Sequence, residues 1–195
     1  MWPLLFISII TLSCIIERLI FWSNLNNKNK RTADLILDEY KKNSNGFIDF
    51  LQNKKKNPYS QLLINIFKME FFNEKDFEKG LEINLINNNK EFNKYGSIFN
   101  LTIGIAPLLG LLGTVLGLMN SFSFIDLGSV GTNTKEVTGG ISEALVSTAY
   151  GLIIAIFTII FSSYFNSLQR NEIISLREFG VKFQILFFNK LSKEV

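Results

Sequence analysis

A run of thirty-one residues, 95–125, carries no charged side chain, although charged residues make up 19% of the chain. Its centre reads Ala-Pro-Leu-Leu-Gly-Leu-Leu-Gly-Thr-Val-Leu-Gly over residues 106–117. The run is long enough to cross a bilayer, which takes about 20 apolar residues. Its centre also contains Pro107, Thr114 and three glycines, which a helix that only faced lipid would not need. Small residues and hydroxyls instead favour a helix that packs closely against other helices or lines a polar path.

Two further apolar runs have the length of a membrane span. The first predicted span is 1–22, with Trp2 and Trp22 near its ends, as is typical of aromatic residues at membrane interfaces. Its start is uncharged and it lacks a small-residue cleavage site, so we interpret it as a retained span rather than a secretory signal. The second span is predicted at 97–124 and the third at 140–165. The expected fold class is therefore an all-α integral membrane protein with three transmembrane helices.

The distribution of basic residues predicts the direction of these spans. Of the twenty Lys and Arg residues, thirteen lie in 23–96, five lie in 166–195 and one is Arg18. The connection at 125–139 contains only Lys135. Because Lys and Arg accumulate on the cytoplasmic side of membrane proteins, 23–96 and 166–195 are predicted to be cytoplasmic. The N-terminus and the short loop at 125–139 are then on the outer side.

The region between the first two spans is predicted to be helical rather than a linker. Apolar residues recur at helical spacing in 32–42, 46–56 and 59–72. Pro58 suits the first turn of a helix, because its missing N–H would have no partner there. We therefore expect several short helices in this cytoplasmic region.

A longer helix is predicted to begin after Asn73, a suitable N-cap, with Asp76 in its first turn. Apolar residues then step by three or four into the second span, and no proline occurs before Pro107. We therefore predict one continuous helix, about 70 Å long, that extends from the membrane into the cytoplasm. The alternative is a separate helical domain joined by a flexible hinge at Gly96. The third span is predicted to continue past Arg170 in the same way.

Small and hydroxyl side chains form one face on each of the second and third spans. The face of the second span consists of Gly110, Thr114, Gly117 and Ser121. The face of the third span consists of Ala144, Thr148, Gly151, Ala155, Thr158 and Ser162. Such faces permit close helix packing, including packing through Gly113-x-x-x-Gly117, or they border a narrow polar path. The two interpretations can hold together.

Among the acidic residues, Glu143 has the position that is most informative about function. It lies at the outer start of the third span, where a carboxylate that faced lipid would be costly. A position near the helix N-terminus would offset part of that cost. In an oligomer, a ring of such residues would attract cations at a pore mouth. The alternative is that Glu143 is a solvated acid in the first helical turn. The other charged pair near a span end, Glu17-Arg18, is interpreted as a structural ion pair at the cytoplasmic boundary.

Composition excludes several classes of function. The chain has no His, and its single cysteine, Cys14, excludes a disulfide or multi-cysteine metal site within one chain. A net charge of +3 gives no indication of nucleic-acid binding. No nucleophile–base pair or cofactor motif indicates an enzyme, and no internal repeat indicates a secondary transporter. No charged residue lies in the middle of any span, so a protein of this kind that moves protons needs a partner to supply the titratable carrier.

Two blocks carry a specific resemblance. Residues 106–119 read Ala-Pro-Leu-Leu-Gly-Leu-Leu-Gly-Thr-Val-Leu-Gly-Leu-Met, and residues 140–151 read Gly-Ile-Ser-Glu-Ala-Leu-Val-Ser-Thr-Ala-Tyr-Gly. Together with Trp2-Pro3 and Ile16-Glu17-Arg18-Leu19, they resemble the ExbB/TolQ branch of the MotA/TolQ/ExbB proton-channel family. The resemblance implies a homopentamer of three-span subunits around a central pore, located in the bacterial inner membrane, with its outer side in the periplasm.

The resemblance also implies partners and residue roles. The pore encloses the single spans of two ExbD/TolR-like subunits, which carry the titratable Asp, and proton flow energises a TonB- or TolA-like envelope-spanning protein. Thr114 and Thr148 are placed on the pore face beside that Asp, with Glu143 in the same lining nearer the outer side. The residues assigned to helix packing or the pore face are Pro107, Gly110, Gly113, Gly117, Gly151 and Ala155. No cofactor or metal is implied.

Some positions depart from the family pattern. Phe157 stands where a proline is usual, which predicts that a kink in the third span is missing. Ser162-Ser163 replaces a usual Tyr-Asn pair, and Tyr150 is bulkier than the small residue expected. The sequence does not distinguish a TonB system from a Tol-Pal system. The alternative function is a structural membrane scaffold that stabilises a single-span partner without conducting protons.

Overall fold

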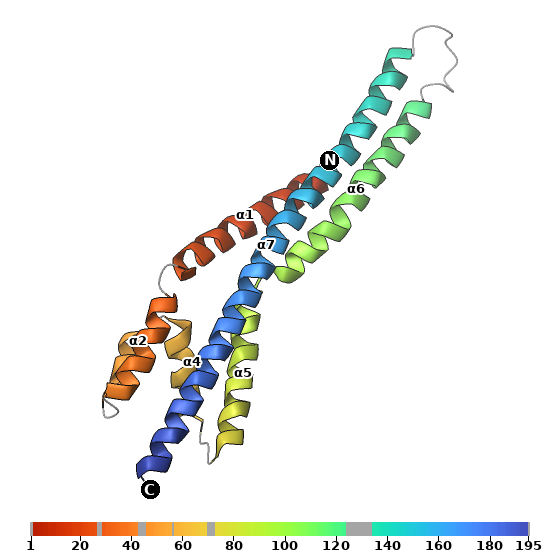
Figure 1. Cartoon of the computed structure of the whole chain (residues 1–195). Helices are drawn as coiled ribbons and strands as arrows, with labels where there is room; N and C mark the ends of the chain where they lie inside the picture. The colour runs from red at the N-terminus through yellow and green to blue at the C-terminus, as the bar shows by residue number, and fades with distance from the viewer. Residues whose placement is uncertain are drawn as a thin grey trace. The chain divides into compact units, whose positions relative to one another are not determined.

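The computed structural model describes residues 2–26, 29–42, 46–55, 57–69, 73–123 and 134–194, and every regular element in these ranges is an α-helix. The helices are α1 (Trp2–Asn26), α2 (Asn29–Lys42), α3 (Phe47–Asn53), α4 (Pro58–Phe67), α5 (Glu74–Phe92), α6 (Gly96–Ser123) and α7 (Thr134–Glu194) (Figure 1). The expected all-α fold is confirmed for this part of the chain. Most of the predicted loop at 125–139 lies outside the described residues, and its last six residues are helical.

Three helices are long and apolar enough to cross a membrane. They cover Trp2–Leu25, Gly96–Ser123 and a segment within Val137–Ser192, with mean hydropathies of 2.2, 2.1 and 2.3. Their outward surfaces are strongly apolar, since Leu108 is 64% and Ile160 is 60% exposed. An apolar surface of this extent requires a lipid or protein environment. By length and composition, the three predicted spans are confirmed as candidate spans.

The prediction of one continuous helix from residue 74 through the second span is wrong. α5 ends at Phe92, and Asn93 leaves the helical conformation with φ −93° and ψ 24°. A separate helix, α6, begins at Gly96. Asn and Gly both have low helix propensity, which favours a break at this point. The apolar periodicity suggested a continuous helix because it persists on either side of a break of three residues. The break agrees with the alternative of a separate helical domain, and the flexible hinge at Gly96 stays a prediction.

The predicted helix starts agree with the structure. The Asn73 side chain accepts a hydrogen bond of 2.9 Å from the backbone N–H of Asp76, which caps α5. Asn57 accepts one of 2.9 Å from the N–H of Tyr59, and Pro58 opens α4. Each cap satisfies an N–H group that has no partner within its helix. The expectation that the third span continues as helix past Arg170 is also confirmed, because α7 runs for 61 residues.

The chain divides into two compact units, and α1 and α7 contribute to both. Unit 1 comprises Met1–Arg18 and Tyr95–Phe165, and unit 2 comprises Leu19–Lys94 and Asn166–Val195. Unit 1 holds most of the apolar helical length. At its boundary, Arg18 is only 3% exposed and bonds Glu17 at 2.7 Å, which confirms the predicted ion pair.

An aromatic cluster forms the core of unit 2. The buried ring of Phe183 in α7 lies 4.9 Å from Tyr40, 5.7 Å from Phe47 and 6.4 Å from Phe77, measured between centroids. Aromatic pairs at such distances contribute about 0.5–1.5 kcal/mol each beyond the burial of their area. Ring packing therefore helps to hold α2, α3 and α5 against α7.

Two aromatic side chains of unit 2 carry buried polar atoms. Tyr59 is 2% exposed, stacks edge-on against Phe179, and bonds Glu172 and Ser175 through its hydroxyl. Burial, with a smaller contribution from the Glu172 carboxylate, raises the pKa of Tyr59 above its ordinary value. Trp22 is 6% exposed and packs on Phe92 at 5.5 Å. The ring of Trp22 therefore packs within the protein, and its position at a membrane interface stays a prediction.

Candidate functional site between α6 and α7

α6 and the first half of α7 lie side by side in unit 1, in contact through small residues (Figure 1). A Cβ atom on Gly151 would be 2.5 Å from the carbonyl oxygen of Ala106 and 3.1 Å from the Cα of Gly110. A Cβ atom on Gly110 would be 3.0 Å from both the carbonyl oxygen of Ser147 and the Cα of Thr148. The separation of the two backbones therefore requires glycine at both positions.

Two further glycines of α6 extend this contact. A Cβ atom on Gly117 would be 2.7 Å from the Cβ of Ala144, and one on Gly113 would overlap the hydroxyl of Ser147. The Gly113-x-x-x-Gly117 spacing thus places both glycines against α7. Close backbone approach of this kind brings carbonyl groups of one helix within reach of hydroxyls on the other.

Hydroxyls of α7 bond directly to the backbone of α6. The carbonyl oxygen of Gly110 accepts from Ser147 Oγ and from Thr148 Oγ1, each at 3.0 Å. Thr114, the other predicted pore hydroxyl, donates at 2.6 Å to the carbonyl of Leu111 in its own helix. The hydroxyl of Thr148 is therefore part of the contact between α6 and α7, whereas the hydroxyl of Thr114 bonds within α6.

Glu143 lies on a groove beside this contact. The groove has a volume of about 740 Å³, and its polar lining includes Asn120, Ser121 and Ser123 from α6 and Glu143 from α7. Glu143 is exposed and, among the described residues that line the groove, is the one ionisable side chain. α7 begins at Thr134, so Glu143 lies in the third turn. The expectation that the helix N-terminus stabilises Glu143 is wrong, because that effect is confined to the first turn.

The remaining predicted residues have different surroundings. Ala155 is 4% exposed and Thr158 is 1% exposed, so the small face of α7 is buried beyond the groove. Pro107 is half-buried inside α6, where its missing N–H leaves the carbonyl of Ile103 without its usual helical donor. Phe157 stands in the uninterrupted helix α7 and is 48% exposed.

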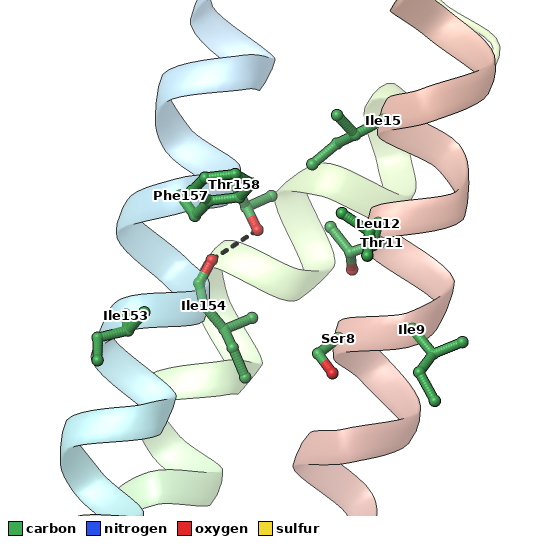
Figure 2. A pocket seen from close by; sticks show the side chains of 9 residues that line it. All are labelled: Ser8, Ile9, Thr11, Leu12, Ile15, Ile153, Ile154, Phe157 and Thr158. Atoms are coloured by element: carbon green, nitrogen blue, oxygen red, sulfur yellow. Dashed lines mark hydrogen bonds between the residues drawn. The ribbon is translucent and has the colours of Figure 1, made fainter.

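A second, smaller cavity lies between α1 and α7 (Figure 2). It has a volume of about 210 Å³ and is lined mainly by aliphatic side chains and Phe157. Its three hydroxyls are already bonded: Ser8 to the carbonyl of Leu5, Thr158 to that of Ile154, and Thr11 to another threonine. A stable buried water needs two to four polar partners, which this lining does not supply. The mainly apolar lining makes this cavity a poor candidate for a proton path.

Two sets of polar side chains in unit 1 were not identified from the sequence. Ser147 lies three residues after Ala144 and four before Gly151, so helical stepping would have placed it on the same face. The pair formed by Thr11 and Thr102 had no local signal, because its members are 91 residues apart.

Comparison with known proteins identifies relatives of this chain. Residues 54–178 match the sequence model of the MotA/TolQ/ExbB proton channel family. The chain is 37% identical over 177 residues to the putative biopolymer transport protein ExbB-like 3 of Synechocystis sp., covering 90% of this chain and 84% of that protein. It is 26% identical to ExbB-like 1 of the same organism, over 96% of this chain and 74% of the relative. It is 35% identical to the biopolymer transport protein ExbB of Helicobacter pylori, over 56% and 72% respectively. The matched region contains the whole contact between α6 and α7.

Proposed function

Because the chain belongs to the MotA/TolQ/ExbB proton channel family, we propose that it is a proton-channel stator subunit of the ExbB/TolQ kind. With an ExbD/TolR-like partner, it converts proton motive force into mechanical work on a TonB- or TolA-like protein. The observation that carries this proposal is the contact between α6 and α7. We call this contact, where the glycines of α6 and α7 bring the two backbones together, the seam. Thr148 and Ser147 place their hydroxyls in the seam, beside a groove that is lined in part by Glu143.

The proposed assembly is a homopentamer in the bacterial inner membrane, with α6 and α7 around a pore that holds the partner's span. The large exposed apolar area on the candidate spans supports burial in lipid and in contacts between subunits. The concentration of basic residues in 23–96 and 166–195 supports a cytoplasmic position for both segments. The N-terminus and the connection at 125–139 are then periplasmic.

The proposed mechanism requires a titratable carboxylate from the partner, because no charged residue lies in the middle of any predicted span. When protonated, that carboxyl group is neutral and can face apolar surface. When deprotonated, it accepts hydrogen bonds from the hydroxyls of Thr114 and Thr148. A bond to a charged acceptor contributes about 1.5–3 kcal/mol and one to a neutral acceptor about 0.5–1.5 kcal/mol, so donation to the carboxylate offsets the loss of the Gly110 or Leu111 bond. Alternating protonation from the two sides would then bias the position of one ring against the other.

Proton flux into liposomes tests this function. The full chain is co-reconstituted with the single-span partner that co-purifies with it, and flux is driven by a pH gradient. Thr148→Val is expected to reduce flux strongly while assembly stays normal. Ser13→Ala serves as a control, because Ser13 donates to the carbonyl of Ile9 in its own helix. Full proton-driven activity of Thr148→Val would show that this hydroxyl has no such role.

A non-conducting scaffold is the second candidate function. The observation that favours it is that both threonine hydroxyls already donate within the chain, Thr114 to Leu111 and Thr148 to Gly110. In that case the seam only holds α6 and α7 together for a single-span partner. An intact complex that gives no proton flux above that of empty liposomes would support the scaffold.

A further inference from the structure

The cavity between α1 and α7 has a buried floor and an exposed rim. Thr11 and Ile15 point from α1 into the space between the two helices (Figure 2). The floor consists of Thr11, Ile15 and Thr158, which are at most 3% exposed. The rim consists of larger apolar side chains that are each about half exposed: Ile9, Leu12, Ile153 and Phe157. The cavity therefore opens to its surroundings between apolar side chains.

The floor favours an apolar occupant. The Thr11 hydroxyl is paired with that of Thr102 at 2.9 Å, and the Thr158 hydroxyl donates to the Ile154 carbonyl at 2.7 Å. A polar ligand would therefore give up its own hydrogen bonds without gaining new ones, which is unfavourable. An empty volume of about 210 Å³ is also unfavourable, because the atoms around it lose contacts on one side. An apolar group that fills the cavity avoids both costs.

The depth of the cavity limits which apolar groups can reach it. Its α1 residues, 8–15, lie near the middle of the candidate span Trp2–Leu25. Its α7 residues, 153–158, lie near the middle of the predicted span at 140–165. Since the hydrocarbon core of a bilayer is about 30 Å thick, the cavity is roughly 15 Å from either layer of headgroups. At this depth the surroundings offer the ends of lipid acyl chains or the side chains of another helix.

The rim favours an acyl chain over another helix. Helices pack closely in membranes through small residues, which let the two backbones approach. The rim has no such residue, and the small faces of α6 and α7 are already packed on each other through Gly110 and Gly151. An acyl chain is thin and has no bulky backbone, so it can enter between the rim side chains.

We propose that this cavity binds the terminal part of one acyl chain of a membrane phospholipid, which completes the packing of α1 against α7. The inference requires only that α1 and α7 lie in a bilayer, so it goes beyond the proposed function and does not depend on proton conduction. The described residues that line the cavity carry no charge, so they recognise the hydrocarbon chain rather than a particular headgroup.

Photolabelling tests the proposal. The full chain with its co-purified partner is placed in liposomes of phosphatidylethanolamine and phosphatidylglycerol. The probe is a phosphatidylethanolamine with a photoreactive diazirine near the end of one acyl chain. Label on the floor residues is expected, because these side chains are too buried to be reached from the surrounding bilayer. Label on Ile160, which is 60% exposed and does not line the cavity, gives the reference for ordinary contact with lipid.

Two serines of α1 provide a matched pair of variants. Ser8 lines the cavity and donates to the carbonyl of Leu5, whereas Ser13 does not line it and donates to the carbonyl of Ile9. Ser8→Leu fills part of the cavity, so the ratio of floor label to Ile160 label should fall. Ser13→Leu makes the same chemical change outside the cavity and should leave the ratio unchanged. Ser8→Val adds less bulk, is easier to accommodate, and should give a smaller loss.

A photoreactive benzoylphenylalanine at Phe157 identifies the occupant directly. Cross-linking to phospholipid that is lost in Ser8→Leu and kept in Ser13→Leu is the expected result. Cross-linking mainly to a second copy of the chain would overturn the inference. An unlabelled floor in the unmodified chain, or an equal floor ratio in the unmodified, Ser8→Leu and Ser8→Val proteins, would also overturn it. None of these results depends on proton flux, so the proposed function is tested separately.

Discussion

The hydroxyls of Thr11 in α1 and Thr102 in α6 lie 2.9 Å apart, and the two side chains are 3% and 1% exposed. Within a bilayer no water is present to satisfy a buried hydroxyl, so each threonine depends on the other. This pair is a direct polar link between the first and second spans, and it lies apart from the contact between α6 and α7.

A double-mutant cycle tests the link between the first two spans. Thr11→Val and Thr102→Val should each destabilise the protein, and the double variant should lose less than the sum, with a coupling of about 0.6–1.7 kcal/mol. The measurement is thermal or denaturant unfolding in detergent. Additive losses would mean that the two hydroxyls do not depend on one another.

Glycine substitutions test the closeness of α6 and α7. Gly151→Ala places a methyl group 2.5 Å from the Ala106 carbonyl, so the two helices must separate and the protein should lose about 2 kcal/mol or more. Gly104→Ala on α6 is the matched control, because a Cβ atom there meets nothing within 4 Å. It should stabilise the helix by about 0.5–1 kcal/mol, since alanine is the better helix former. Equal effects of the two changes would contradict the close approach.

Glu143→Gln tests whether the groove carries protons or only holds a solvated acid. Gln is similar in size and cannot titrate, so proton flux should fall by about tenfold, which corresponds to about 1.4 kcal/mol in the barrier. Glu143→Asp should restore part of the flux because it keeps the carboxylate. Assembly is monitored by size-exclusion chromatography, since Glu143 is exposed and its loss should not disturb packing. Unchanged flux in Glu143→Gln would support the interpretation as a solvated acid.

Alkaline unfolding tests the burial of Tyr59. Its pKa is raised in the folded protein, whereas an unfolded tyrosine titrates near pH 10. Above about pH 10 the unfolded state therefore releases a proton that the folded state retains, and the free energy of unfolding falls by about 1.4 kcal/mol for each pH unit. Tyr59→Phe removes this titration, so its stability should decline less steeply between pH 10 and 11 than that of the unmodified protein. Parallel declines would show that Tyr59 is accessible when folded.

Properties that depend on neighbours in the chain could be predicted from the sequence. The three spans follow from apolar length, because transfer of a helix into lipid depends on its own side chains. The caps at Asn57 and Asn73 bond residues two or three positions away, so Pro58 and Asp76 were sufficient signals for these helix starts. The glycine-rich blocks were sufficient to indicate the family.

Contacts between distant segments were decided only by the tertiary structure. The sequence showed the small faces of α6 and α7, but only their packing paired Gly110 with Ser147 and Thr148. Periodicity did not reveal the break before Gly96, since it describes one face of a helix and not where the backbone leaves it. Whether a hydroxyl is bonded or buried depends on which carbonyl another helix brings within about 3 Å, and that distance is a property of the packed helices rather than of either sequence segment.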